Sequence, residues 1–213
     1  MENYPEKTAR NFSNQEILEK FEEIKKEVVL AGRIKSSRTM GNVAFFHIED
    51  GSGKIQLFLN KKNIGDKKYK LFVENVDIGD FVEARGKLFI TKQGEKTLEA
   101  SDWKMLSKNI RPIPTEYFGL KDKEALLRKR YLDLMMNYET RELFRKKNIF
   151  WQTIRDFLSR NGFLEVQTPV FEHVPGGADA EPFVTHYNAL NEDFFMRISL
   201  ELPLKRLLIG GYE

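Results

Sequence analysis

The sequence predicts an α+β protein with more than one domain: a five-stranded Greek-key β-barrel, then a domain of helices and antiparallel strands. Apolar residues recur at every second position in segments between residues 28 and 108, whereas beyond residue 121 they first follow a helical spacing. Residues 109–120, with two prolines and no periodicity, separate these patterns. With 213 residues and 41% hydrophobic composition, the chain is long enough to form two small cores.

The first predicted element is a short amphipathic helix over residues 13–27. A Ser-Asn pair opens it, and Ile17, Leu18, Phe21 and Ile24 form its apolar side. We expect this helix to pack as a lid on the strands that follow.

Five strands are expected between residues 28 and 108. The segments VVLAGRIKSSR, NVAFFHIED and KIQLFLN alternate with a period of two and are separated by the turn-forming stretches Met-Gly-Asn and Asp-Gly-Ser-Gly. A lysine-rich stretch and the apolar segment LFVENV predict a helical insert. The last two strands are FVEARGKLFIT and KTLEASDWKML, joined by a Lys-Gln-Gly-Glu turn. This order is that of an OB-fold, a barrel suited to oligonucleotides.

The second part begins with helices. KDKEALLRKRYLDLMM and residues 139–160 have helical periodicity, and Gly162 is well placed just after the helix end. A short strand, FLEVQ, is closed by Thr-Pro. After a Pro-Gly-Gly loop, DFFMRISL predicts a strand and ELPLKRLLIGG a helix that tolerates Pro203 in its first turn.

Composition excludes several classes of protein. The 35 Lys+Arg residues nearly balance 32 Asp+Glu, so the net charge of +3 is not that of a strongly basic nucleic-acid binder. Without cysteine there is no disulfide, thiolate zinc site or cysteine nucleophile, and His47, His173 and His186 lack metal-ligand spacing. No apolar stretch approaches the roughly 20 residues of a membrane span, and the N-terminus has no apolar signal core. We expect a cytoplasmic protein without a membrane segment.

Several stretches in the second half resemble class II aminoacyl-tRNA synthetases. The helix up to residue 160 together with GFLEVQTP resembles motif 1, which builds the dimer interface in that class. RYLDL (residues 130–134), PGGADAEPF with THYNAL (residues 175–190), and RISLEL with KRLLIGG (residues 197–211) are similar to the lysine enzymes. AGRIKSSRTMGNVAFFHIEDGSGKIQLFL in the first half resembles the anticodon domain of those enzymes.

The resemblance implies a domain organisation. Residues 1–27 would form an N-terminal helix, 28–108 an OB-fold anticodon-binding domain, 109–120 a linker, and 121–213 the first part of a class II antiparallel-sheet catalytic domain. That domain would be incomplete, because motifs 2 and 3, with the catalytic arginine, are expected beyond Glu213. We therefore expect these 213 residues alone to make no adenylate. Gln167 departs from the glutamate usual in the family, which removes a charge.

The activity that the resemblance implies is ATP-dependent ligation of L-lysine to tRNA(Lys) in protein synthesis. The lysine carboxylate attacks the α-phosphorus of ATP, and the resulting lysyl-adenylate is transferred to the terminal ribose of the tRNA. ATP is the co-substrate, Mg²⁺ acts in the intact enzyme, and the enzyme is a homodimer through motif 1. No metal ligand is expected within these residues, and no cofactor is expected to bind them alone.

Four residues are implied as anticodon readers. By family position, Phe45 stacks on a base of a uridine-rich anticodon, and Arg38, Gln56 and Glu95 read base edges. Phe45 and Phe46 are neighbours in a strand, so only one of them can face the core. Composition alone favours the alternative that Phe45 is a core residue and Gln56 an ordinary polar residue on a solvent-facing strand surface.

Two residues are implied as lysine binders. An ammonium removed from water needs charged hydrogen bonds, which a carboxylate supplies for the ε-ammonium, while a closely approaching backbone can serve the α-amino end. Glu201 resembles the substrate-contacting glutamate of the family, and Gly177 resembles its loop glycine. Alternatively, Glu201 is an N-terminal helix carboxylate favoured by the helix dipole, and Gly176-Gly177 is an ordinary turn.

Other functions stay open at this point. A naturally short tRNA-binding OB-domain protein without ligase activity, or an aspartyl- or asparaginyl-tRNA synthetase, would also begin with such a barrel. Lysine ligases that modify proteins generally lack the barrel. Basic runs at residues 67–70, 128–130 and 145–147 are more typical of solvated helix faces than of tRNA backbone contacts.

Overall fold

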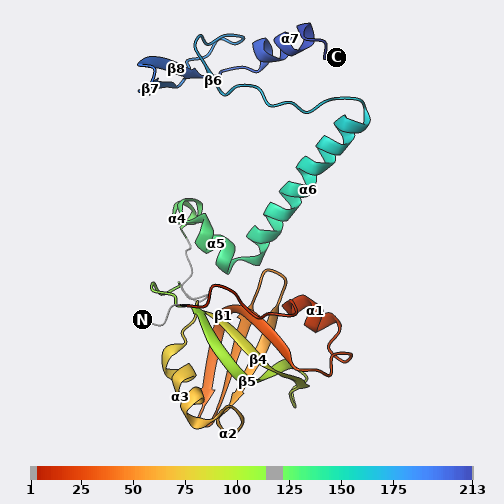
Figure 1. The fold of residues 1–213 in the computed structure, drawn as a ribbon, viewed down its shortest axis with the longest axis vertical. Helices are drawn as coiled ribbons and strands as arrows, with labels where there is room; N and C mark the ends of the chain where they lie inside the picture. The colour runs from red at the N-terminus through yellow and green to blue at the C-terminus, as the bar shows by residue number, and fades with distance from the viewer. Residues whose placement is uncertain (1–3, 114–121, 213) are drawn as a thin grey trace. The chain divides into compact units, whose positions relative to one another are not determined.

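The computed structural model describes residues 4–113 and 122–212 (Figure 1). By their contacts, the residues form two compact units, Met1–Leu132 and Asp133–Glu213. The predicted linker at residues 109–120 falls mostly on residues 114–121, which lie outside the described residues. The domain boundaries expected from the sequence therefore stay predictions.

A closed five-stranded barrel dominates the first unit and confirms the predicted OB-fold (Figure 1). Its strand order is β1-β2-β3-β5-β4; β3 and β5 pair in parallel, and the other neighbours pair antiparallel. The strands are β1 (Val28–Met40), β2 (Val43–Glu49), β3 (Lys54–Asn60), β4 (Phe81–Ile90) and β5 (Lys96–Ser107). The helical insert lies between β3 and β4, as predicted, and consists of α2 (Lys61–Ile64) and α3 (Asp66–Asn75).

Alternate residues of the strands fill the barrel. On β2, Ala44, Phe46 and Ile48 are at most 1% exposed, whereas their neighbours are only partly buried. The insert closes this core, because the ring of Phe72 on α3 meets Phe46 edge-on at a centroid distance of 4.8 Å. Burying a phenylalanine side chain of this kind contributes about 1.5–3 kcal/mol of hydrophobic stabilisation.

The N-terminal helix is shorter than predicted. α1 spans Asn14–Glu19 and begins with a capping box between Ser13 and Glu16, but it ends well before residue 27. Phe21 is still only 7% exposed, and Ile24 also packs against the barrel core, although neither lies in a helix. The apolar spacing therefore reflects packing on the barrel, while the chain turns after residue 20 to enter β1.

The helices beyond residue 121 follow the prediction with one difference. The segment predicted as one helix divides at Lys129 into α4 (Lys123–Arg128) and α5 (Arg130–Met136). The long helix α6 spans Tyr138–Arg160, with Asn137 as its N-cap. No helix among the described residues combines the length and apolar character needed to cross a bilayer.

Gly162 ends α6 as predicted. Its φ is +85°, the left-handed conformation that favours glycine after a helix. The amide of Phe163 donates to the carbonyl of Leu158 at 3.1 Å, and that of Gly162 donates to Ser159 at 3.1 Å. This pair of bonds is a Schellman motif, which satisfies carbonyls that the helix end leaves unpaired.

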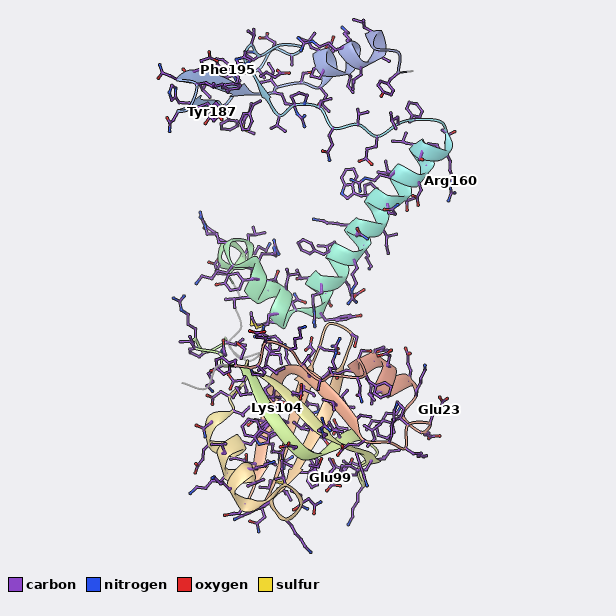
Figure 2. All side chains as sticks on the ribbon, viewed as in Figure 1. Glu23, Glu99, Lys104, Arg160, Tyr187 and Phe195 are labelled. Carbon is purple, nitrogen blue, oxygen red and sulfur yellow. The ribbon has the colours of Figure 1, made fainter. Side chains whose placement is uncertain are left out.

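A small antiparallel sheet and a helix complete the second unit. β6 (Phe171–Glu172) and β7 (Val184–Tyr187) flank β8 (Glu192–Met196), and α7 (Glu201–Ile209) follows with Pro203 in its first turn. Figure 2 labels Tyr187 and Phe195 on the β7–β8 hairpin. The predicted strand DFFMRISL is confirmed only as far as Met196, and β7 was not predicted.

The predicted strand FLEVQ is wrong for this structure. Residues 163–169 form no strand, and among the described residues no segment pairs with them. Because a strand is stabilised by hydrogen bonds to a neighbour, apolar and β-branched residues alone do not make one.

Candidate nucleic-acid interface and amino-acid site

The outward side chains of β1, β2 and β3 form a surface that we call the barrel face. Because side chains alternate along a strand, Phe45 points outward while Phe46 fills the core with 1% exposure. The backbone pairing places Arg38 of β1 opposite Phe45, and Phe45 opposite Phe58 of β3. The core position therefore belongs to Phe46, and Phe45 is not the core residue that composition alone favours.

Three aromatic rings lie in a row that begins on this face with Phe45 and Phe58 and continues to Phe89 on β4. The ring centroids of Phe45 and Phe58 are 4.9 Å apart, and those of Phe58 and Phe89 are 5.6 Å apart. Phe45 is only partly buried, and Arg38 beside it is exposed. A partly exposed ring held by its neighbours can offer one face to an unstacked base without first losing conformational freedom.

A polar network lies beside the aromatic row. The Gln56 amide donates from Nε2 to Glu95 Oε2 at 2.6 Å, and the Thr97 hydroxyl donates to Gln56 Oε1 at 2.9 Å. Gln56 is only 8% exposed and Thr97 is fully buried, so Gln56 is not a loosely solvated strand residue. Both ends of its amide are already hydrogen-bonded within the protein.

Glu95 reaches this network from the turn between β4 and β5. The turn is closed by the Thr91 amide donating to the Glu95 carbonyl at 3.0 Å, and by the Glu95 amide donating to Thr91 Oγ1 at 3.0 Å. Its second carboxylate oxygen, Oε1, lies 2.7 Å from His47 Nε2. The side chain remains 43% exposed, so it can still accept further hydrogen bonds from outside.

The structure brings the four predicted anticodon readers to this one side of the barrel, and it adds residues that sequence reasoning missed. Phe58 and Phe89 extend the aromatic row, and His47 with Ser36 extends the polar network. The signal for His47 was present, because a period of two puts it on the same side of β2 as Phe45. From the sequence, however, His47 was weighed only as a possible metal ligand.

The two predicted lysine-binding residues lie next to each other. Gly177 has φ +84°, and a Cβ built on it would lie 3.2 Å from Ser199 Oγ and 3.3 Å from the Glu201 Cβ. A larger residue here would therefore be strained and would crowd the start of α7. The Glu201 amide donates to Ser199 Oγ at 3.1 Å, which fixes the first residue of that helix.

The Glu201 carboxylate already forms an ion pair with a lysine of the same helix. Lys205 Nζ lies 2.5 Å from its Oε1, one helical turn further along α7. The hydrogen bond and the charge of Lys205 lower the pKa of Glu201 below its usual value. Glu201 thus also meets the alternative expectation of an ionised carboxylate in the first turn of a helix.

A groove of about 530 Å³ lies nearby on the second unit, but neither Gly177 nor Glu201 lines it. Residues 167–169, residues 171–174 and one side of α7 form its walls. Arg197 holds one wall in place by donating from one guanidinium nitrogen to the carbonyl and hydroxyl oxygens of Thr168, both at 2.7 Å. The predicted amino-acid site and this hollow are therefore different places.

Charged groups elsewhere are mostly paired locally. Each basic run singled out from the sequence contains at least one paired residue: Lys68 with Asp102, Arg128 with Glu124, and Arg145 with Glu142. Such pairs fit solvated helix and strand surfaces. Within the described ranges, no group of three or more His, Cys, Asp or Glu residues could hold a metal ion.

Two protein-family models match separate parts of the chain. Residues 28–106 match the OB-fold nucleic acid binding domain, and residues 122–213 match the tRNA synthetases of class II (D, K and N).

Three curated relatives, all named lysine–tRNA ligase, are similar over most or all of the chain. The Pelotomaculum thermopropionicum protein is 44% identical over 214 residues, which cover 100% of this chain and 42% of the relative. The Halalkalibacterium halodurans protein is 48% identical over 195 residues, 92% of this chain and 39% of the relative. The Thermotoga maritima protein is 43% identical over 220 residues, 100% of this chain and 44% of the relative. The chain therefore spans about two fifths of the length of these relatives.

Proposed function

We propose that this protein takes part in ligating L-lysine to tRNA(Lys). The proposal is supported by the match of residues 28–106 to the OB-fold nucleic acid binding domain and of residues 122–213 to the class II tRNA synthetases. The similarity of the whole chain to lysine–tRNA ligases supports lysine as the amino acid. The observation that carries the proposal is the barrel face, where Phe45, Arg38 and Glu95 offer a stacking ring, donors and an acceptor within one surface.

Uracil suits that combination of groups. Its Watson–Crick edge presents one N–H donor between two carbonyl acceptors, and an unpaired uridine also offers a ring for stacking. In this proposal Phe45 stacks on the base, the carboxylate of Glu95 accepts from the base N–H, and the guanidinium of Arg38 donates to a carbonyl. Cytosine, with an acceptor where uracil has its N–H, would face the Glu95 carboxylate unfavourably.

Gln56 has a different role in this proposal from the one expected by family position. Its amide nitrogen donates to Glu95, its oxygen accepts from Thr97, and only 8% of the residue is exposed, so turning the amide outward toward a base would break these bonds. Breaking a buried hydrogen bond leaves a donor or acceptor unsatisfied, at a cost of about 1–3 kcal/mol. Gln56 therefore acts by holding Glu95, which reads the base.

We assign lysine binding to Gly177 and Glu201. Their closeness favours contact with the same end of the substrate: the Glu201 carboxylate accepts hydrogen bonds from an ammonium group, and the backbone at Gly177 approaches it without a side chain. Lys205 already places an ammonium on this carboxylate, so a bound lysine would compete with it.

ATP and Mg²⁺ belong to the proposed reaction, but we assign none of the described residues to either. No described cluster fits a metal ion, so no step is attributed to one in this chain. We also propose that the protein forms a homodimer through α6, because this helix carries the exposed apolar side chains of Phe150, Trp151 and Phe157. We propose further that it acts in the cytoplasm as part of protein synthesis.

Binding of an RNA hairpin tests the proposal. The hairpin carries the anticodon loop of tRNA(Lys), and its affinity for the 213-residue chain is measured by fluorescence anisotropy at two salt concentrations. The proposal expects tighter binding of a UUU loop than of a CCC loop at both salt concentrations. Equal affinity for the two loops would mean that the barrel binds RNA only through its charge, and the proposal would fall.

A further inference from the structure

We propose that His47 is a positioning residue for base discrimination: together with Ser36 it holds the Glu95 carboxylate in place as an acceptor beside Phe45. The inference rests on the proposed function, because it names the residue that orients the proposed base reader. His47 lies on β2, two residues from Phe45 and on the same side of the strand.

The geometry fixes the imidazole at both ends. Nε2 lies 2.7 Å from Glu95 Oε1, and Nδ1 lies 2.8 Å from the Ser36 hydroxyl. Ser36 stands opposite His47 in the β1–β2 register, so the backbone brings the hydroxyl to the ring. The His47 side chain is 27% exposed, so its exposure is intermediate between that of the buried Gln56 and that of the more exposed Glu95.

These contacts determine which nitrogen carries the proton. An ionised carboxylate only accepts hydrogen bonds, so the Nε2 atom facing Glu95 must carry hydrogen. In the neutral imidazole, Nδ1 then accepts from the Ser36 hydroxyl, and in the charged form it donates to the hydroxyl oxygen. In either state His47 donates to Glu95, so the carboxylate is held whether or not the histidine is charged.

Two donors hold Glu95 without saturating it. His47 engages Oε1 and Gln56 engages Oε2, whereas an ionised carboxylate offers about four lone-pair positions. The remaining positions stay available to an incoming base. A glutamate on a turn would otherwise sample many rotamers, and fixing it before binding lowers the entropic cost of recognition.

Substitutions at position 47 separate this role from a purely structural one. His47→Phe keeps the ring shape but removes the donor, whereas His47→Gln keeps an N–H donor at a comparable reach. A structural role would weaken binding of all RNAs alike. Positioning of Glu95 would instead change the ratio of affinities for a UUU loop and for a CCC loop.

The experiment compares both hairpins on the 213-residue chain and its variants. We expect His47→Phe to reduce the UUU to CCC affinity ratio by about tenfold, the effect of losing one charged hydrogen bond. His47→Gln should recover most of that ratio. His186→Gln is the matched control, because His186 also pairs with an acid, Asp193 at 2.8 Å, but lies on the β7–β8 hairpin. It should leave the ratio unchanged.

The outcomes distinguish the two claims. An unchanged ratio in His47→Phe, with weaker UUU binding in Phe45→Ala, overturns the role of His47 and leaves the proposed function standing. Equal binding of both hairpins by the unsubstituted chain overturns both. Should His47→Phe unfold the barrel, Ser36→Ala carries the test, and the expected result is a smaller loss of the same ratio. Independently of RNA, ¹⁵N NMR must show hydrogen on Nε2, and the Nδ1–H tautomer would contradict the inference.

Discussion

Phe45 and Phe46 are identical neighbours that the strand sends to opposite sides of the barrel. Phe46 is 1% exposed and packs on Phe72 of α3, whereas Phe45 lies partly exposed beside Phe58. The same side chain therefore serves packing at one position and, in our proposal, base stacking at the next.

This difference gives a prediction that uses each residue as the control for the other. Phe45→Ala should weaken binding of a UUU hairpin by about 5- to 150-fold, the range for one lost base stack of about 1–3 kcal/mol, with little change in stability. Phe46→Ala should instead lower the free energy of unfolding by about 3–5 kcal/mol. Fluorescence anisotropy and urea denaturation measure the two effects. Similar stability losses in both variants would contradict the assignment of the two faces.

A second pair of residues tests the lysine site. Gly177 and Gly162 have almost the same φ, +84° and +85°, but only Gly177 has atoms near the position of a Cβ. Gly162→Ala should cost the backbone strain alone, about 1–2 kcal/mol of stability. Gly177→Ala should add crowding against Ser199 and Glu201, and it should weaken lysine binding, measured by calorimetry, while Gly162→Ala should not. Equal lysine affinities in the two variants would argue against the site.

At the residue scale, the sequence predicted positions better than partners. A period of two was enough to predict that one of Phe45 and Phe46 faces outward. The hydrogen bond between Gln56 and Glu95, by contrast, became visible only in the structure. The bonds of His47 to Glu95 and Ser36 depend on which strands become neighbours and in what register. That information is not present in the local pattern of β2.

The turn between β2 and β3 depends on one carboxylate. Asp50 Oδ1 accepts hydrogen bonds from the amide and hydroxyl of Ser52 and from the amide of Gly53, and Oδ2 accepts from the amide of Asn14 at the start of α1. Burial raises the pKa of Asp50, but the hydrogen bonds from Ser52, Asn14 and Gly53 outweigh it and hold the pKa below its usual value. The Asp50 side chain thus joins the hairpin to the N-terminal helix.

The lowered pKa predicts a dependence of stability on pH. A carboxyl whose folded-state pKa is depressed stabilises the protein above its ordinary pKa of about 4, and the stabilisation is lost as pH falls through the folded-state pKa. The free energy of unfolding should therefore decrease below about pH 4. Asp50→Asn should lower the free energy of unfolding at pH 7 by about 1–3 kcal/mol, and in this variant the free energy of unfolding should fall less steeply with decreasing pH below about pH 4. Asp66→Asn, which changes an exposed acid paired with Lys61, is the control. If the free energy of unfolding of Asp50→Asn fell as steeply with acid as that of the unsubstituted chain, the role of this carboxylate would be contradicted.

At the element scale, the barrel strands were predictable because their side chains alternate between the core and the outer surface, which is clearest on β2, where every second residue is buried. The second unit was less predictable for a physical reason. FLEVQ has strand-like composition but no partner among the described residues, and β7 is exposed along its whole length and therefore shows no alternation of burial. Similarly, the apolar spacing at Phe21 and Ile24 reflects contact with the barrel and not a continuing helix.

The two units differ in how much apolar surface they bury. Every buried hydrophobic residue of the core, among those described, lies between Ile17 and Ala100. On α6, by contrast, Phe150, Trp151 and Phe157 are each more than half exposed. Figure 2 shows the side chains of α6 projecting along its length as far as Arg160. Exposed aromatic side chains in such number mark a surface that needs a partner.

This contrast predicts unequal stability within one chain. In native-state hydrogen exchange, barrel amides should be protected by the full free energy of unfolding, about 5–15 kcal/mol. Amides of α6, β7 and β8 should exchange through local opening that costs only a few kcal/mol. Mass spectrometry of peptides from the two units measures the difference. Equal and cooperative protection across both units would show that the second unit is stable by itself.

In our proposal, the barrel face binds an unstacked, uridine-rich loop. The most direct test is an NMR titration of the 213-residue chain with a hairpin carrying a UUU loop and, separately, with one carrying a CCC loop. We predict that the UUU hairpin shifts the signals of Arg38, Phe45, Gln56 and Glu95 most strongly and that the CCC hairpin shifts them much less. Shifts confined to the basic runs, or identical shifts with both hairpins, would contradict the claim.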